Sequence, residues 1–233
     1  MTVKNYLIRS LYKINSAVGI NPGAQPSITS TDYRVYKKMH DLTLPTLEKH
    51  IGGEWELVLF EGEVEHAQQM HKEVFMRTYQ MWSEQPCNIL FVDLDIMAFG
   101  PIDFFNQYND FTMFSQIGDE ALNGYPLDQY YNCGLRYFPH TIDSAVWDLG
   151  LSLYKEWPDK GCEWDRDQLV YSKMLLSQPN FVFPNVAINS FYMSYDVNPE
   201  FLKQYKLLHF HSSKGPRAVH ALMKRYLEES GQQ

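Results

Sequence analysis

The sequence predicts a single α/β domain with a mostly parallel central sheet flanked by helices. Helical and strand patterns alternate over the first hundred residues, as in sheets whose parallel strands are joined by right-handed helical crossovers. Residues 89–92 (ILFV) are apolar without interruption, which is typical of a strand buried on both faces. A chain of 233 residues can bury one sizeable core, and no linker or repeat divides it, so we expect one domain over residues 1–233.

Breaker residues set the limits of the elements in the first half. Pro45 is expected to kink or restart a helix that begins near residue 30, and Gly52 and Gly53 stop that helix. Pro86 ends a second helix before the buried strand. The expected order is a strand and a loop within residues 1–31, a helix, a strand at 55–62, a helix at 63–84 and the strand at 89–92.

The second half of the chain is more mixed. Short apolar segments predict strands at 111–118, 135–139, 181–188 and 207–211. Helices are expected at 142–157, 167–177 and within 218–233.

Composition excludes several classes of protein. An apolar fraction of 45% with 15% aromatic residues excludes a disordered chain. Acidic side chains number 28 and basic ones 20, a formal charge of −8, so we expect no general attraction for nucleic acid. No window holds the ~18 continuous apolar residues of a membrane span, and no transmembrane segment is expected.

Cysteine usage and the N-terminus bear on location. Cys87, Cys133 and Cys162 are widely spaced without a CxxC pair, which argues against a disulfide framework or a zinc knuckle and suits a reducing compartment. The basic stretch before Asp32 weakly resembles an organellar transit peptide, but a first strand of the domain is the preferred interpretation. We therefore expect a cytoplasmic protein.

The most informative segment is NILFVDLDIMAFGPIDFF at 88–105, where the buried strand runs into Asp93, Leu94 and Asp95. Side chains two apart on a strand point the same way, about 6.6 Å apart along the chain, and two carboxylates at that distance repel by roughly 2.5 kcal/mol at an effective dielectric of about 20. Such a pair either retains one proton or holds a cation, and Mg²⁺ and Mn²⁺ prefer oxygen ligands. The alternative is an acidic loop that is solvated or paired with arginine, and Leu94 is expected to pack on the opposite side.

This segment resembles the D-x-D strand of GT-A-fold glycosyltransferases, which have a Rossmann-like fold and use nucleotide-diphosphate sugars, usually with Mn²⁺. The C-terminal segment LLHFHSSKGPR resembles the H-F-x-G-x-x-K element of the family-eight retaining transferases, in which a histidine completes the metal site. The other matching segments are YYNCGLRYFP, with an N-x-G turn at Asn132 and Gly134, and EWDRDQLVY, with a DQ motif at Asp167 and Gln168. The C-terminal element has Ser212 and Ser213 where that family has a glycine, and the first strand, YLIRSLYKI, has no early Asp-x-Asn. These two departures leave the subfamily and the nucleotide base open.

The resemblance implies a hexosyltransferase that uses Mn²⁺ or Mg²⁺, a nucleotide-diphosphate sugar (a UDP-sugar first of all) as donor, and a hydroxyl of a glycan, lipid or protein as acceptor. His209 and His211 share one face of the expected last strand, and a neutral imidazole can ligate Mn²⁺. The implied metal ligands are Asp93, Asp95, His209 and His211. The implied donor-binding residues are Arg77, Asp93, Leu94, Asp95, Asn132, Gly134 and Lys214, with Lys72 as a weaker candidate. The implied catalytic residues are Asn132, Asp167 and Gln168.

The role of Asp167 differs between two kinds of enzyme. In an inverting transferase this acid could be the general base, whereas in a retaining one it would orient donor and acceptor. An acid at the start of a helix can also serve only as a cap or a partner of the helix dipole. The sequence leaves these three roles open.

Two further functions compete with a transferase. A phosphohydrolase of the haloacid dehalogenase type also carries a nucleophilic aspartate at the end of a buried strand, but Met97 stands where its motif has Thr or Val. A non-catalytic module that binds nucleotide sugars would show binding without turnover. The products formed from nucleotide sugars and from phosphomonoesters distinguish the three functions.

Overall fold

Five strands of the described chain form the central sheet of this computed structural model, which describes residues 3–15, 30–102, 104–113, 133–156, 166–179, 187–190, 206–210 and 216–231. The sheet has the order β2-β1-β3-β6-β5. The bounds are Lys4–Ile14 for β1, Glu56–Val64 for β2, Cys87–Val92 for β3, Thr112–Met113 for β5 and Leu135–Phe138 for β6. β1 is parallel to both β2 and β3, but β6 is antiparallel to both β3 and β5. The α/β class is confirmed, and the expectation of a mostly parallel sheet is corrected to a mixed one.

A second, smaller sheet lies beside the first and was not expected. It consists of β4 (Ile96–Ala98), β8 (Leu207–Phe210) and β7 (Ala187–Ser190) in the order β4-β8-β7. β8 is antiparallel to β4 and parallel to β7. The chain passes from β3 of the large sheet to β4 of the small one through Asp93, Leu94 and Asp95.

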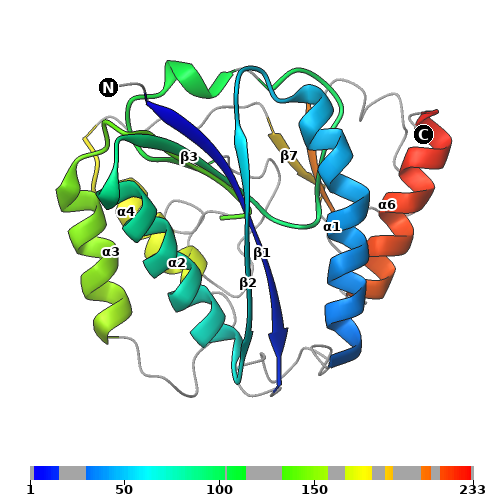
Figure 1. Ribbon diagram of the computed structural model, residues 1–233, viewed down its shortest axis with the longest axis horizontal. Coiled ribbons are helices and arrows are strands. Elements are labelled where there is room, and N and C mark those ends of the chain that lie inside the picture. The colour runs from blue at the N-terminus through cyan, green and yellow to red at the C-terminus, as the bar shows by residue number, and fades with distance from the viewer. Residues whose placement is uncertain are drawn as a thin grey trace.

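Helices cover both faces of the central sheet (Figure 1). α1 and α6 lie together on one side, and α2, α3 and α4 lie on the other. The bounds are Ser30–His50 for α1, Ala67–Glu84 for α2, Ser144–Glu156 for α3, Arg166–Leu176 for α4 and Pro216–Ser230 for α6, with a short 3₁₀ helix, η1, at Phe104–Gln107. The carboxyl end of β1 and the amino ends of α1 and α2 lie at the same end of the molecule.

Most of the expected elements are present with shifted limits. α1 continues through Pro45, and α2 begins at Ala67 because β2 extends to Val64, which pairs with Ile14 of β1. The strands expected at 111–118 and 181–188 are described only in part, as β5 and the first residues of β7. Their remaining residues lie outside the described ranges.

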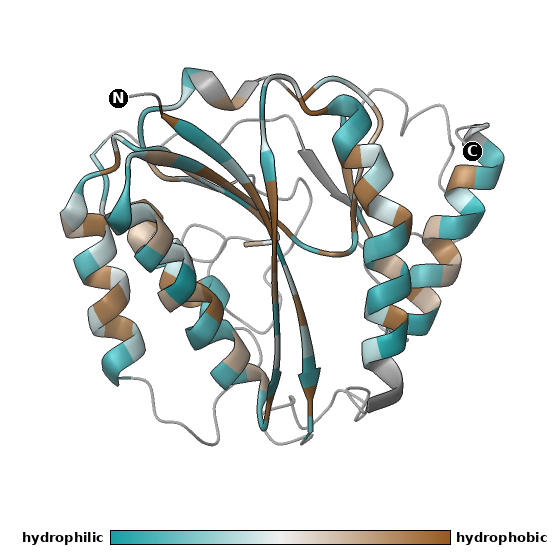
Figure 2. Cartoon of the chain, in the orientation of Figure 1, coloured by the Kyte–Doolittle hydropathy of each residue, from teal (hydrophilic) through white to brown (hydrophobic). Residues whose placement is uncertain are grey.

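The central strands are buried on both faces, as the uninterrupted apolar run in β3 predicts. In β3, Ile89 and Phe91 join the core under α2, α3 and α4, whereas Leu90 and Val92 join the core on the other face. Figure 2 shows this as brown, apolar colour along the middle of the central strands. In the part of the chain that the structure describes, no helix is both long enough and apolar enough to cross a membrane.

Candidate functional site

The D-x-D segment forms a turn rather than the end of a strand. β3 ends at Val92, and the Asp93 carbonyl accepts a hydrogen bond from the Ile96 amide at 3.3 Å. Leu94 is 9% exposed and belongs to the apolar core beneath α1 and α6. The expected packing of Leu94 is therefore confirmed, but the two acids converge through a turn, and the strand spacing of about 6.6 Å does not apply.

Three elements hold the backbone of this turn. The Asp93 carbonyl accepts a hydrogen bond from Nη2 of Arg9 on β1 (2.9 Å), and the Leu94 carbonyl accepts one from Oγ1 of Thr43 on α1 (3.2 Å). The Asp95 carbonyl accepts one from the Phe210 amide on β8 (2.9 Å). All three carbonyls of the turn are thus bonded to fixed elements, which positions the two carboxylates before any ligand binds.

A possible metal-binding group forms where the two sheets meet. Asp93, Asp95 and His209 each offer a ligand atom, and these atoms all lie within 4.8 Å of one another. Nε2 of His209 is 3.0 Å from Oδ1 of Asp95, because Ile96 of β4 pairs with His209 of β8. Two carboxylates and an imidazole suit Mn²⁺, and the carboxylates also suit Mg²⁺.

The charge around Asp93 fits a cation. Burial raises the pKa of the Asp93 carboxyl well above its ordinary value, Arg136 opposes this shift, and Asp95 adds to it. The Asp93 carboxylate has no ion pair with another described residue. The nearby Arg9 donates its hydrogen bond to the backbone carbonyl of Asp93 and not to the carboxylate. The ionised carboxylate is therefore incompletely compensated, and a divalent ion would supply the missing positive charge.

These side chains line a cavity of about 210 Å³. Its walls come from β1, β3, β8, the D-x-D turn, four helices (α1, α2, α3 and α4), and Cys133, Gly134 and Arg136. Gly134 lies in the wall, and its carbonyl accepts a hydrogen bond from the Asp93 amide at 2.8 Å. The cavity therefore lies at the carboxyl end of β3, where ligands bind in open α/β sheets.

Arg136 is the buried cation of this cavity. It is 4% exposed, and its guanidinium lies over the rings of Phe91 and Tyr171, at 4.0 and 4.3 Å from their centroids. Arg136 faces Phe91 across the β3–β6 pair, so it lies on the same face of the sheet as the cavity. The positive charge of Arg136 lowers the pKa of the Asp93 carboxyl and the pKa of the His71 imidazole.

Asp167 lies in the cavity wall in contact with two other side chains. Its Oδ2 is 3.2 Å from Nδ1 of His71 and accepts a hydrogen bond from Sγ of Cys133 at 3.2 Å. Burial lowers the pKa of His71, Asp167 acts in the opposite direction, and Arg136 lowers it further. Gln168, the next residue of α4, also lines the cavity.

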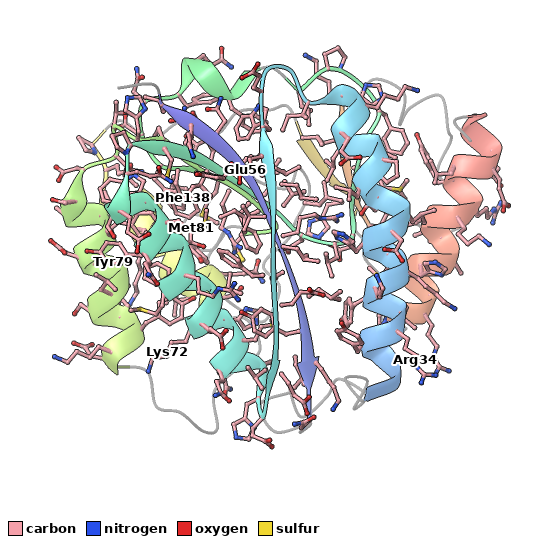
Figure 3. All side chains as sticks on the ribbon, in the orientation of Figure 1. Arg34, Glu56, Lys72, Tyr79, Met81 and Phe138 are labelled. Carbon is pink, nitrogen blue, oxygen red and sulfur yellow. The ribbon has the colours of Figure 1, made fainter. Side chains whose placement is uncertain are left out.

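The structure brings together seven of the residues that the sequence singles out. Arg77 is not among them: its Nη1 donates to the hydroxyl of Tyr12 at 3.0 Å, and its guanidinium lies 4.2 Å from the centre of the Phe60 ring, outside the cavity lining. Lys72, labelled on α2 in Figure 3, is also outside the lining. Those in the lining are Asp93, Leu94, Asp95, Gly134, Asp167, Gln168 and His209. Asn132, His211 and Lys214 lie outside the described residues.

No protein-family model matches this chain. No curated protein matches it either.

Three residues of the site were missed by sequence reasoning. Arg9 interrupts an apolar strand, and a charge at such a position is a usable signal of a buried polar contact. Arg136 interrupts the apolar segment LRYF in the same way, whereas nothing in the helical pattern distinguishes His71.

Arg9 is a cation at neutral pH. Burial lowers its pKa to about 10, and the negative charges of Asp95 and Asp93 oppose this shift.

The contact between Arg9 and α1 predicts a pH dependence of stability. Nη1 of Arg9 is 3.4 Å from Nδ1 of His40, and burial and Arg9 together lower the pKa of His40. Below about pH 6.5, His40 binds a proton in the unfolded chain but not in the folded chain. The free energy of unfolding therefore falls as the pH falls. In urea unfolding between pH 7 and 5, we expect His40→Gln to lose less free energy of unfolding than the wild type. The difference in slope should not exceed about 1.4 kcal/mol per pH unit, the limit for one proton, and equal slopes would contradict the assignment.

Proposed function

We propose that this chain is a metal-dependent glycosyltransferase with a GT-A fold, which transfers a sugar from a nucleotide-diphosphate sugar, a UDP-sugar first of all, to a hydroxyl of a glycan, lipid or protein. The observation that carries the proposal is the convergence of Asp93, Asp95 and His209 on one side of a cavity whose wall also holds Asp167 and Gln168. The order of these motifs along the chain supports it.

The acidic group suits the leaving group of glycosyl transfer. A nucleoside diphosphate gains negative charge as the bond to the sugar breaks, and Mn²⁺ or Mg²⁺ held by Asp93, Asp95 and His209 would neutralise that charge where it develops. The fixed carbonyls of the D-x-D turn keep the two acids in place, so little reorganisation is needed during the reaction.

The protein's own side chains have distinct tasks in this scheme. The amide of Gln168 can both donate to and accept from sugar hydroxyls. Gly134 has no side chain, so a donor can approach its backbone closely. The rings around Arg136 close the apolar side of the cavity and limit the water that competes with an acceptor.

A panel of nucleotide sugars tests the proposal. Purified protein is incubated with UDP-, GDP- and dTDP-sugars, with Mn²⁺ or with excess chelator, and the released nucleoside diphosphate is measured. We expect release with at least one donor, and a loss of at least about 100-fold with the chelator, which corresponds to roughly 2.7 kcal/mol of transition-state stabilisation. Orthophosphate release from phosphomonoesters would identify the phosphohydrolase instead, and a thermal shift with a donor but no turnover would identify the binding module.

A further inference from the structure

Asp167 is not an isolated acid in the cavity. Its Oδ2 is engaged with both His71 Nδ1 and the thiol of Cys133, each at 3.2 Å, and the residue is only 7% exposed. This oxygen accepts a hydrogen bond from the thiol and lies within ion-pair distance of the imidazole, so both neighbours compete with a substrate proton for it. Oδ2 of Asp167 is therefore occupied by these two neighbours.

The contact with Asp167 favours one tautomer of His71. Nδ1 of His71 lies 3.2 Å from a carboxylate oxygen, which only accepts hydrogen bonds, so this contact favours the neutral tautomer with its hydrogen on Nδ1 and its lone pair on Nε2. His71 lies near the start of α2 and lines the same cavity as Asp93 and Asp95. A neutral imidazole in a cavity, oriented by a carboxylate, is the usual arrangement of a general base.

We propose that His71 is the general base of the transfer reaction and that Asp167 is its positioning residue, so that the sugar is transferred in one displacement with inversion at the anomeric carbon. The acceptor hydroxyl gives its proton to Nε2 of His71 while its oxygen bonds to the anomeric carbon. The bond from that carbon to the diphosphate oxygen breaks, and its electron pair leaves with the nucleoside diphosphate. The imidazolium then releases its proton to solvent.

This inference rests on the proposed function and adds the identity of the base and the stereochemistry. Two charged groups shift the pKa of the His71 imidazole. Asp167 on α4 favours the protonated form, and Arg136 on β6 disfavours it. The thiol of Cys133 shares the same carboxylate oxygen. His71 is therefore expected to be neutral at pH 7 and able to accept a proton.

The test uses the full chain with Mn²⁺, the nucleotide sugars named above and water as acceptor. His71→Asn places an amide donor near Asp167 but has no basic nitrogen. We expect its kcat to fall at least about 100-fold, with KM for the donor within about threefold of the wild type.

The decrease of kcat/KM at low pH that the wild type shows should be absent in His71→Asn. Added imidazole should restore part of the activity of His71→Ala. His220→Gln on α6 removes another histidine whose pKa is lowered by burial, outside the cavity lining, and should leave kcat and its pH profile unchanged.

Two measurements on the wild type need no variant. Nitrogen-15 NMR of the metal-free protein should show His71 with its hydrogen on Nδ1. Proton NMR of the released sugar, recorded before mutarotation, should show the inverted anomer. A retained anomer, the other tautomer, or a His71→Asn kcat within threefold of the wild type would each overturn the inference and leave the proposed function standing. If the wild type releases no nucleoside diphosphate from any donor, the proposed function fails, and this inference fails with it.

Discussion

Replacement of Asp95 by alanine is expected to abolish Mn²⁺-dependent release of nucleoside diphosphate, with a loss of at least about 100-fold in kcat/KM. Asp95 offers one of the three ligand atoms of the Asp93, Asp95 and His209 group, and its carboxylate lies 3.0 Å from His209. Removal of this oxygen leaves two ligands for the ion. The thermal shift that Mn²⁺ produces in the wild type should also disappear.

The fold should survive this change. The carbonyl of Asp95 is held by the Phe210 amide, and neither group is altered in Asp95→Ala. Circular dichroism should be that of the wild type. Asp148→Ala, at an exposed acid on α3, is the matched control and should leave turnover and the Mn²⁺ shift unchanged. Full turnover of Asp95→Ala at saturating Mn²⁺ would refute the metal assignment.

Replacement of Arg136 by methionine is expected to cost about 2 kcal/mol or more of unfolding free energy. Arg136 is buried and its charge favours the ionised form of Asp93. Loss of the guanidinium leaves negative charge in the cavity without its buried counterpart. It also removes the stacking on Phe91 and Tyr171.

Urea unfolding near pH 7.5 measures this effect. Arg136→Lys keeps the charge but lacks the planar group that lies between the two rings, so it should fall between the wild type and Arg136→Met. Arg225→Met, at a half-exposed position on α6 paired with Glu229, is the control and should change stability by less than about 1 kcal/mol. A loss below about 1 kcal/mol in Arg136→Met would show that Arg136 does not balance the acids.

The pattern of apolar residues predicted a helix or strand well where that pattern lies within one continuous segment. The apolar run before Asp93 predicted a strand buried on both faces, and β3 packs against both cores. The amphipathic spacing after Ile142 predicted α3. Strand direction carries no such local signal, because the four buried residues of β6 read the same whether the strand lies parallel or antiparallel to β3. For that reason the mixed sheet was not predicted.

Sequence alone identified the two acids after a buried strand and the order of the motifs that follow, because residue type and spacing are local properties of the chain. Tertiary structure decided which of these residues meet. His209 reaches Asp95 only because β8 pairs with β4, and His71 reaches Asp167 only because α2 and α4 cover the same face of the sheet. Such contacts join segments far apart in the chain, and the periodicity of one segment does not contain the position of another.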